Sequence, residues 1–202
     1  MAGSEKVEAY FTGVASSYHQ ASRGRVWGAV RRREAAALVA MTGDVTGREI
    51  LELGCGAGFY TRLLLERGAR HIWAVDLSEA MLSELPKTGV TAIRADASLA
   101  DPGRQFDLLV SAGMLEFVPD PVAVFANAAR LAMPGARLVA LVPTRSILGR
   151  AYRLFHRRNG LSVRLFDAAA LAAMAAASGW ALSRIVPAGP YSAVADLVRS
   201  AG

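Results

Sequence analysis

The sequence predicts an α/β fold: a Rossmann-like, doubly wound sheet of about seven strands, mostly parallel with an antiparallel last strand, and with helices on both faces. Three observations predict it. Apolar runs of strand length alternate with helical stretches along most of the chain. Several of these runs are rich in consecutive Val, Ile and Leu, which is typical of strands buried on both faces. Gly, Pro and Ser mark the boundaries, and 202 residues fit one domain, 1–202.

The chain begins with an N-terminal helical segment within residues 5–40, which is rich in strong helix formers, and a turn at 42–47. The alternating strands and helices come after this turn. Each predicted strand is a short apolar run, and the runs are 48–54, 71–77, 90–96, 106–112, 136–143, 180–187 and 191–198. Each predicted helix carries start or stop signals, such as Ser78 as an N-cap, and the helices are 59–68, 78–86, 120–135, 147–158 and 166–179. Because most strands are joined through helices, we expect a parallel sheet with ligands beyond the carboxyl ends of its strands.

Composition excludes several classes of protein. A single cysteine, Cys55, excludes a disulfide framework and a zinc site built from cysteines. The three histidines lie far apart in the sequence, so we expect no metal site. No apolar run reaches the roughly 18 residues of a membrane span, and the N-terminus lacks the apolar core of a signal peptide. We therefore expect a cytoplasmic protein.

The net charge of +6 is distributed unevenly. Residues 34–144 carry nine bases and thirteen acids, whereas residues 145–164 carry six arginines and no acid. A second basic segment, residues 1–33, carries six bases and two acids. A mildly acidic body with two basic segments differs from the continuous basic stripe of a duplex-binding protein. Nucleic acid is therefore not an expected partner.

A glycine-rich turn carries the strongest functional signal. The first strand ends in Glu52-Leu53-Gly54-Cys55-Gly56-Ala57-Gly58, where alternating glycines let backbone N–H groups approach a ligand. The second strand ends in Asp76, whose carboxylate can accept both hydroxyls of a ribose. The combination indicates a nucleoside-bearing cofactor.

Two residues favour S-adenosylmethionine over a dinucleotide. The dinucleotide pattern GxGxxG, counted from Gly54, requires a glycine at its sixth position, where this chain has Phe59. Glu52, two residues before the first glycine, would repel a pyrophosphate but suits a ligand that carries a sulfonium and an ammonium. A nicotinamide enzyme is therefore an unfavoured alternative.

Four segments resemble the successive motifs of class I S-adenosylmethionine-dependent methyltransferases: Glu52–Gly58, Val75–Ser78 with Met81, Arg94–Ala97, and Phe106–Asp107 through Leu115–Pro121. They are most similar to the methyltransferase type 11 branch, which includes the ubiquinone and menaquinone biosynthesis methyltransferases. The resemblance covers roughly residues 10–186. It is specific for fold and cofactor, and it does not identify the substrate.

The resemblance implies a set of cofactor contacts. The backbone of Gly54, Cys55 and Gly56 would contact the methionine and ribose, and Asp76 would bind the ribose hydroxyls. Leu77 and Met81 would pack on the adenine ring, whose nitrogens would bind Asp96 and the Ala97 N–H. The carbonyls of Ser111 and Ala112 would accept from the ammonium, and Tyr18, Glu52 and Phe117 would lie nearby. Met81 and Leu77 could equally be ordinary core residues.

The chain departs from its relatives at one position. Relatives often read Leu-Glu-His-Val after the fourth strand, and this chain has Phe117 in place of the histidine, which removes a frequent candidate base. The remaining candidates for a general base are Tyr18, His19, Glu116 and His156. Paired metal-binding acids of the catechol type are not evident, so we expect a metal-independent reaction.

Two additions to the core are expected to select the substrate: an N-terminal helical lid, 1–40, and a basic insert, 144–164. Within the insert, residues 147–158 fit one amphipathic helix, with apolar residues on one face and Arg150, Arg153 and Arg157 on the other. This helix could be a lid with a solvated basic face, an entrance for an anionic group, or a contact with an anionic membrane that holds a lipid-like acceptor.

We therefore expect an enzyme that moves a methyl group from S-adenosylmethionine to a small organic acceptor by in-line displacement and leaves S-adenosylhomocysteine. An anionic molecule and a lipid-like molecule are the two candidate acceptors. Two alternatives remain. The high isoelectric point would suit an RNA methyltransferase, and the absent histidine would suit a protein that binds S-adenosylmethionine without transferring methyl. The sequence does not identify the acceptor atom or the oligomeric state.

Overall fold

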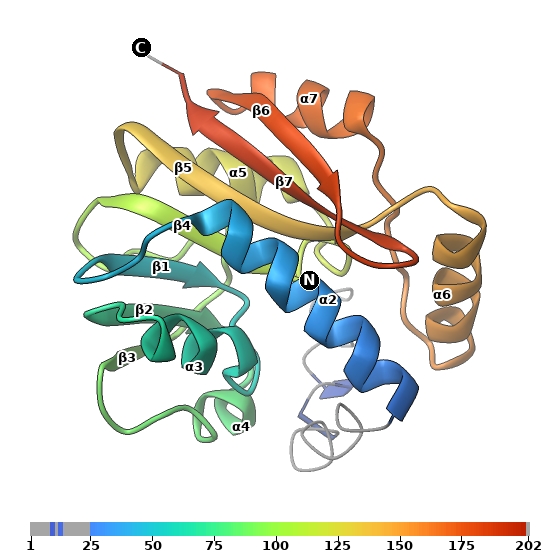
Figure 1. The fold of residues 1–202 in the computed structure, drawn as a ribbon, viewed down its shortest axis with the longest axis horizontal. Helices are drawn as coiled ribbons and strands as arrows, with labels where there is room; N and C mark the ends of the chain where they lie inside the picture. Colours follow the sequence, from blue (N-terminus) through green and yellow to red (C-terminus); the bar gives the residue numbers. More distant parts are fainter. Residues whose placement is uncertain (1–8, 11, 14–24, 201–202) are drawn as a thin grey trace.

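A computed structural model describes residues 9–10, 12–13 and 25–200 of the protein. Its centre is a seven-stranded sheet with the order β3-β2-β1-β4-β5-β7-β6 (Figure 1). The strands are β1 Glu49–Leu53, β2 His71–Asp76, β3 Val90–Arg94, β4 Phe106–Ala112, β5 Ala132–Pro143, β6 Trp180–Pro187 and β7 Ser192–Arg199. The first five strands pair in parallel, and β7 runs antiparallel to both β5 and β6. The predicted fold class is confirmed.

Helices cover both faces of this sheet (Figure 1). They are α2 Arg25–Thr42, α3 Phe59–Glu66, α4 Glu79–Leu82, α5 Pro121–Arg130, α6 Ile147–Arg158 and α7 Ala168–Ala176. Strand residues of one parity, such as Ile50, pack with Leu38 of α2 and Leu64 of α3. Residues of the other parity, such as Leu51, pack with Phe125 of α5 and Leu171 of α7. Strand alternation thus produces two separate cores, one on each face.

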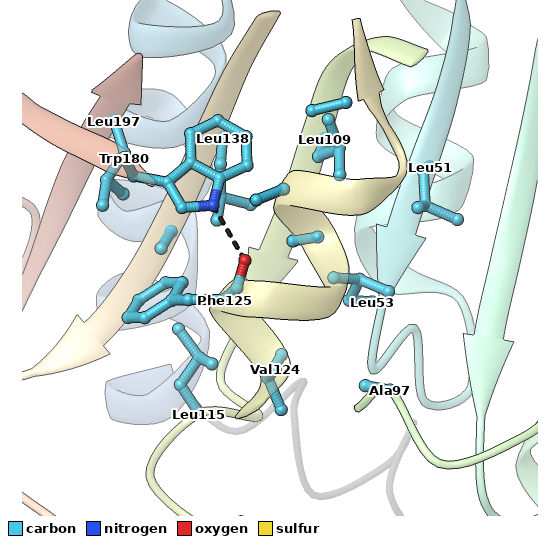
Figure 2. Packing of buried hydrophobic residues seen from close by; sticks show 14 of the residues in the cluster. Leu51, Leu53, Ala97, Leu109, Leu115, Val124, Phe125, Leu138, Trp180 and Leu197 are labelled. Carbon is cyan, nitrogen blue, oxygen red and sulfur yellow. Dashed lines mark hydrogen bonds between the residues drawn. The ribbon is translucent and has the colours of Figure 1, made fainter. Parts of the chain in front are cut away.

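Trp180 anchors the core on the α5 side (Figure 2). Its side chain is buried, and its indole Nε1–H donates a hydrogen bond of 2.9 Å to the carbonyl oxygen of Phe125. A buried indole requires such a partner because an unpaired N–H in an apolar core costs about 1–3 kcal/mol. This bond fixes α5 against the edge strand β6.

The order of the strands determines where a ligand can bind. The chain runs from β1 outward to β2 and β3, and then returns to β4 on the other side of β1. The loops after β1 and β4 therefore diverge at the carboxyl edge of the sheet, and a crevice at such a switch point is the usual ligand site of open α/β sheets.

Two helices and one strand have bounds that differ clearly from the sequence prediction. The predicted helix 120–135 ends at Arg130, and β5 begins at Ala132. Phe106 pairs with Ala132 and Leu108 pairs with Arg137, so the residues between loop out of the ladder, and Gly135 supplies the positive φ that this loop requires. The predicted helix 78–86 contains only the four residues of α4. The last strand in sequence is not at the edge, because β7 lies between β5 and β6.

α2 belongs to the predicted N-terminal lid segment, and it packs against β5 and β7. Arg137 of β5 holds its end: the guanidinium donates to the carbonyl oxygens of Met41 and Thr42, and it pairs with Asp196 of β7. Residues 25–42 are thus part of the layer that covers the sheet. Closure of the whole segment 1–40 over the site stays a prediction.

Candidate functional site

The glycine-rich turn leaves β1 at the switch point. Gly54, Gly56 and Gly58 have φ values of 74°, 52° and 80°, a region that favours glycine. The N–H groups of Gly54 and Cys55 both donate to the carbonyl oxygen of Val75. A Cβ added at Gly54 would overlap the side chain of Met114 from the loop after β4. The turn therefore requires glycine for its conformation and for its close neighbours.

Asp76 ties the turn to the second strand. Its Oδ2 accepts a hydrogen bond of 2.8 Å from the N–H of Gly56, and its Oδ1 accepts one of 3.0 Å from the N–H of Ser78. The Ser78 hydroxyl lies 2.9 Å from the hydroxyl of Thr12, so the N-terminal segment also reaches this corner. The loops after β1 and β2 therefore meet at the Asp76 carboxylate, and the N-terminal segment contacts the neighbouring Ser78.

Glu52 lies beneath the turn, on the α3 side of β1. Its side chain is 1% exposed, and its carboxylate accepts a hydrogen bond of 2.6 Å from the Thr61 hydroxyl of α3. The pKa of Glu52 is raised to about 8, mainly because burial disfavours the charged form; the Thr61 bond opposes this rise, and the negative charge of Asp76 adds to it. A cation bound above the turn would favour ionised Glu52, whereas a pyrophosphate would disfavour it.

A second polar loop follows β3. Asp96 accepts hydrogen bonds from the N–H and the hydroxyl of Ser98 through one oxygen, Oδ1. Asn127 of α5 donates to the carbonyl oxygens of Ala97 and Ala100. The loop after β3 is therefore held from two sides.

The other residues predicted to contact the cofactor differ in burial. Met81 is buried and packs with Ala57 of the glycine turn, and Ala97 is buried in the core on the α5 side. Leu77 and Ala112 are half-buried and border the switch point. Cys55 is buried, and burial raises the pKa of its thiol, so the residue is uncharged at neutral pH.

Three buried side-chain atoms within the described ranges have no hydrogen-bond partner: Ser111 Oγ, Glu116 Oε2 and His156 Nδ1. Buried polar atoms are normally paired, and each exception requires an explanation. Ser111 ends β4, Glu116 follows in the next loop, and His156 lies on α6. All three belong to segments that the sequence assigned to the site.

Glu116 is 4% exposed, and Gly113 lies beside its carboxylate. Its pKa is raised to about 8, mainly because burial disfavours the charged form, and the negative charge of Glu34 on α2 contributes to the rise. Glu34 is itself buried, accepts a hydrogen bond of 2.7 Å from Ser192 Oγ, and has a pKa raised by burial. Two buried carboxyls thus influence each other where α2 meets the loop after β4.

Phe117 packs within a small apolar cluster that joins three segments. Its buried neighbours are Leu161, Val163 and Leu165 of the insert, and Tyr10 and Tyr152 pack against them. The ring of His156 lies 5.5 Å from that of Phe117, and burial lowers the pKa of His156. The residue that replaces histidine in the motif therefore contacts a histidine supplied by α6.

The structure brings most of the predicted site residues to the carboxyl edge of β1, β2, β3 and β4. Of the candidate bases, Glu116 and His156 lie on segments that meet at Phe117. Tyr18 and His19 lie outside the described residues. The catalytic roles of these side chains stay predictions.

Three further residues contribute to the site: Thr61, Glu34 and Met114. A signal for Glu34 exists in the sequence, because Glu34, Leu38 and Met41 share the spacing of one helix face, which places an acid on the buried side of α2. The contact of Met114 with Gly54 depends on the tertiary fold, and local sequence carries no signal for it.

The described part of the chain contains neither a candidate metal site nor a candidate membrane-spanning helix. No group of three His, Cys, Asp or Glu side chains is placed to hold a metal ion. No described helix is both long and apolar enough to cross a membrane.

Comparison with known proteins adds to this geometry. Residues 26–184 match the family described as methyltransferase domain. The curated relatives include a ubiquinone biosynthesis O-methyltransferase of Stutzerimonas stutzeri, 33% identical over 103 residues, which are 47% of this chain and 44% of the relative. Another, of Methylococcus capsulatus, is 38% identical over 121 residues, 55% of this chain and 49% of the relative. The chain thus matches about half the length of each.

Solved structures share the fold. The crystal structure of magnesium protoporphyrin IX methyltransferase from Synechocystis PCC 6803 with bound S-adenosylhomocysteine covers 96% of this chain and 98% of its own length, with a TM-score of 0.74 and 19% identity. At this identity the likeness shows the fold alone.

Proposed function

The chain belongs to the methyltransferase-domain family, and from that premise we propose that it transfers the methyl group of S-adenosylmethionine to a small organic acceptor. One observation carries the proposal: the glycine turn at the switch point is joined to Asp76 through the Gly56 N–H, at 2.8 Å. This hydrogen bond supports the proposal that Asp76 binds the ribose hydroxyls, next to the backbone of the glycine turn.

The cofactor would lie across the carboxyl edge of the first four strands. Asp76 would bind the ribose hydroxyls, and Gly54, Cys55 and Gly56 would contact the methionine and ribose through the backbone. Asp96 has an oxygen, Oδ2, that does not accept from Ser98 and would accept from the adenine amino group. The remaining contacts would come from Leu77, Met81, Ala97, Ser111, Ala112 and Phe117.

The donor set of the site fits a cationic ligand. The negative charge of Asp76 disfavours the ionised form of Glu52, and a cation bound nearby would offset that repulsion. Ser111 Oγ is buried without a partner at the end of β4. The ammonium of a bound methionine group would also meet the carbonyls predicted at Ser111 and Ala112.

The acceptor would be apolar or aromatic in its body. The cluster around Phe117 combines the N-terminal segment, the loop after β4 and the insert, and its members are aliphatic and aromatic. The arginines Arg150, Arg153 and Arg157 are exposed on α6 and do not belong to this cluster. This arrangement favours the lipid-like acceptor over the anionic one.

The curated relatives are named O-methyltransferases of ubiquinone biosynthesis, which favours a hydroxyl as the acceptor group. S-adenosylmethionine, when bound, supplies a methyl carbon activated by a positively charged sulfur. The hydroxyl proton would pass to the unpartnered Oε2 of Glu116 as the new oxygen–carbon bond forms and the carbon–sulfur bond breaks. His156, with its unpartnered Nδ1, is the alternative base.

The surrounding residues would act mainly by alignment. Holding oxygen, methyl carbon and sulfur in line can supply about 7–11 kcal/mol of the barrier reduction, and a general base adds roughly 10²–10⁴-fold. The buried cluster around Phe117 would exclude water from the reacting atoms.

Calorimetric titration with S-adenosylhomocysteine, followed by a screen of phenolic and other hydroxylated acceptors with methyl-labelled S-adenosylmethionine, tests the proposal. We expect saturable binding at one site and label in an ether product. Absence of nucleoside binding would refute the cofactor assignment. Binding without label in any acceptor class would favour a protein that holds the cofactor without transferring methyl.

A further inference from the structure

α6 presents three different sides. Ser146 caps its first turn by accepting a hydrogen bond from the N–H of Gly149. One side packs on the body of the protein: Gly149 is buried, the ring of Tyr152 stacks on Tyr191 with centroids 4.8 Å apart, and His156 contacts Phe117. This side fixes the orientation of the helix.

The opposite side of α6 is apolar and exposed. Ile147 is 85% exposed and Phe155 is 54% exposed, and Leu148 and Leu154 are exposed to a similar extent as Phe155. These four are among only six exposed large hydrophobic side chains in the described part of the chain. Exposed apolar groups that gather in one place mark an interaction surface.

A third side of the helix is basic. Arg150, Arg153 and Arg157 lie along it, and Arg158 follows at the C-terminal end. None of the four forms an ion pair with a described residue, and residues 145–166 contain no acid. Their charge is therefore not neutralised within the described part of the molecule.

We propose that α6 docks this protein on an anionic lipid surface, with Ile147, Leu148, Leu154 and Phe155 inserted among the lipids and the arginines on the headgroups. A helix with bulky apolar residues beside a row of arginines lies in the plane of a membrane interface, and charge selects anionic lipids. Figure 1 shows α6 at the margin of the molecule, apart from the sheet and the helices that cover it.

The charge of the rest of the protein gives the docking a direction. Residues 34–144 carry four more acids than bases, so an anionic surface would repel the body and attract the insert. The packed side of the same helix leads through His156 to Phe117 and the loop of Glu116. Docking would therefore leave only the width of one helix between the proposed acceptor cluster and the lipid in which an apolar acceptor would be dissolved.

Sedimentation of the full chain with vesicles tests this inference, and no cofactor is needed, so its failure leaves the proposed activity untouched. The vesicles contain phosphatidylcholine with a quarter phosphatidylglycerol, or phosphatidylcholine alone. We expect at least tenfold tighter binding to the anionic vesicles at low salt, and weakening as salt rises. No binding to anionic vesicles at low salt would overturn the proposal.

Matched variants separate insertion from charge attraction. Ile147→Ser should weaken binding about fivefold or more, whereas Leu99→Ser, which removes a similarly exposed side chain elsewhere (78% exposed), should not. The double variant Arg150→Gln and Arg153→Gln should weaken vesicle binding. The matched double variant Arg67→Gln and Arg184→Gln, which removes two exposed arginines outside α6, should weaken it less. Equal effects within either pair would overturn the assignment to α6.

A second copy of the chain is the other occupant that could cover an apolar helix side. Light scattering at increasing protein concentration identifies it. A dimer that Ile147→Ser dissociates, without vesicle binding by the monomer, would assign the surface to self-association and overturn the lipid proposal. A protein that stays monomeric and binds anionic vesicles supports it.

Discussion

The amide of Gly56 donates a hydrogen bond of 2.8 Å to the carboxylate of Asp76, and so joins the loops that follow the first and second strands. β1 and β2 are neighbours in the sheet, with Leu53 opposite Val75. The bond therefore spans two adjacent carboxyl ends, and it fixes both the glycine turn and the carboxylate in one corner.

Asp76→Ala should weaken the binding of S-adenosylhomocysteine at least tenfold, because it removes the ribose acceptor and the acceptor for two backbone N–H groups. Calorimetric titration measures the affinity. Asp101→Ala is a matched control, since the exposed Asp101 also accepts a hydrogen bond from a glycine N–H, that of Gly103, but lies away from the site. An unchanged affinity for the Asp76 variant would contradict the ribose assignment.

Glu52→Gln should weaken the binding of S-adenosylmethionine more than the binding of S-adenosylhomocysteine. Glutamine retains an oxygen for the Thr61 hydroxyl but cannot carry the negative charge that favours a sulfonium. Since both ligands have an ammonium and only one has a sulfonium, their ratio of affinities isolates the sulfur charge. We expect this ratio to change by about tenfold, measured by parallel titrations of both ligands. An equal loss of affinity for both ligands would show that the charge of Glu52 does not favour the sulfonium.

The parallel part of the fold could be predicted because each strand is a local apolar run with its own turn signals. The position of β7 between β5 and β6 could not, since it depends on which edge of the sheet remains unpaired after β5 forms. The early start of β5 depends on the loop around Gly135, which only the register with β4 reveals.

The candidate site likewise has features that the sequence predicts and features that depend on the tertiary fold. Gly54, Gly56 and Asp76 form a motif with fixed spacing, and their meeting follows from adjacent parallel strands. The electrostatic repulsion between Glu116 and Glu34 could not be predicted, because it acts between a loop and a helix that is distant in the sequence. For α6, periodicity predicted both the helix and its apolar face. It could not predict that Gly149, Tyr152 and His156 would pack inward and leave that face exposed.

Activity should rise with pH through about 8 if Glu116 is the base, because only its ionised form can accept a proton and its pKa is raised to about 8. If His156 is the base, the rise should lie below pH 6.5, because burial lowers its pKa. The pH profile of kcat/KM distinguishes the two. Glu116→Gln should lower kcat at least 100-fold and remove the rise near pH 8. A profile that this variant leaves unchanged would exclude Glu116.

Stability should fall as pH rises from about 4.5 to about 8. Glu52 and Glu116 have folded-state pKa values of about 8, so between these limits the unfolded chain releases protons that the folded chain retains, which favours unfolding. The slope is at most about 1.4 kcal/mol per pH unit for each group. Urea unfolding at several pH values should show a shallower slope for Glu116→Gln, and an unaltered slope for Glu66→Gln, which changes an exposed acid.

Gly149→Ala should loosen α6 even though alanine is the better helix former. Propensity alone would stabilise the helix by about 1 kcal/mol, but a Cβ at this position would overlap the backbone carbonyl of Thr144. The helix must then move away from the body, which separates Tyr152 from Tyr191 and His156 from Phe117. We expect a lower free energy of unfolding, weaker near-ultraviolet circular dichroism from the tyrosines, and a higher KM for the acceptor with little change in cofactor affinity. A variant as stable as the parent, or more stable, would show that α6 does not rest on this glycine, because the two effects have opposite signs.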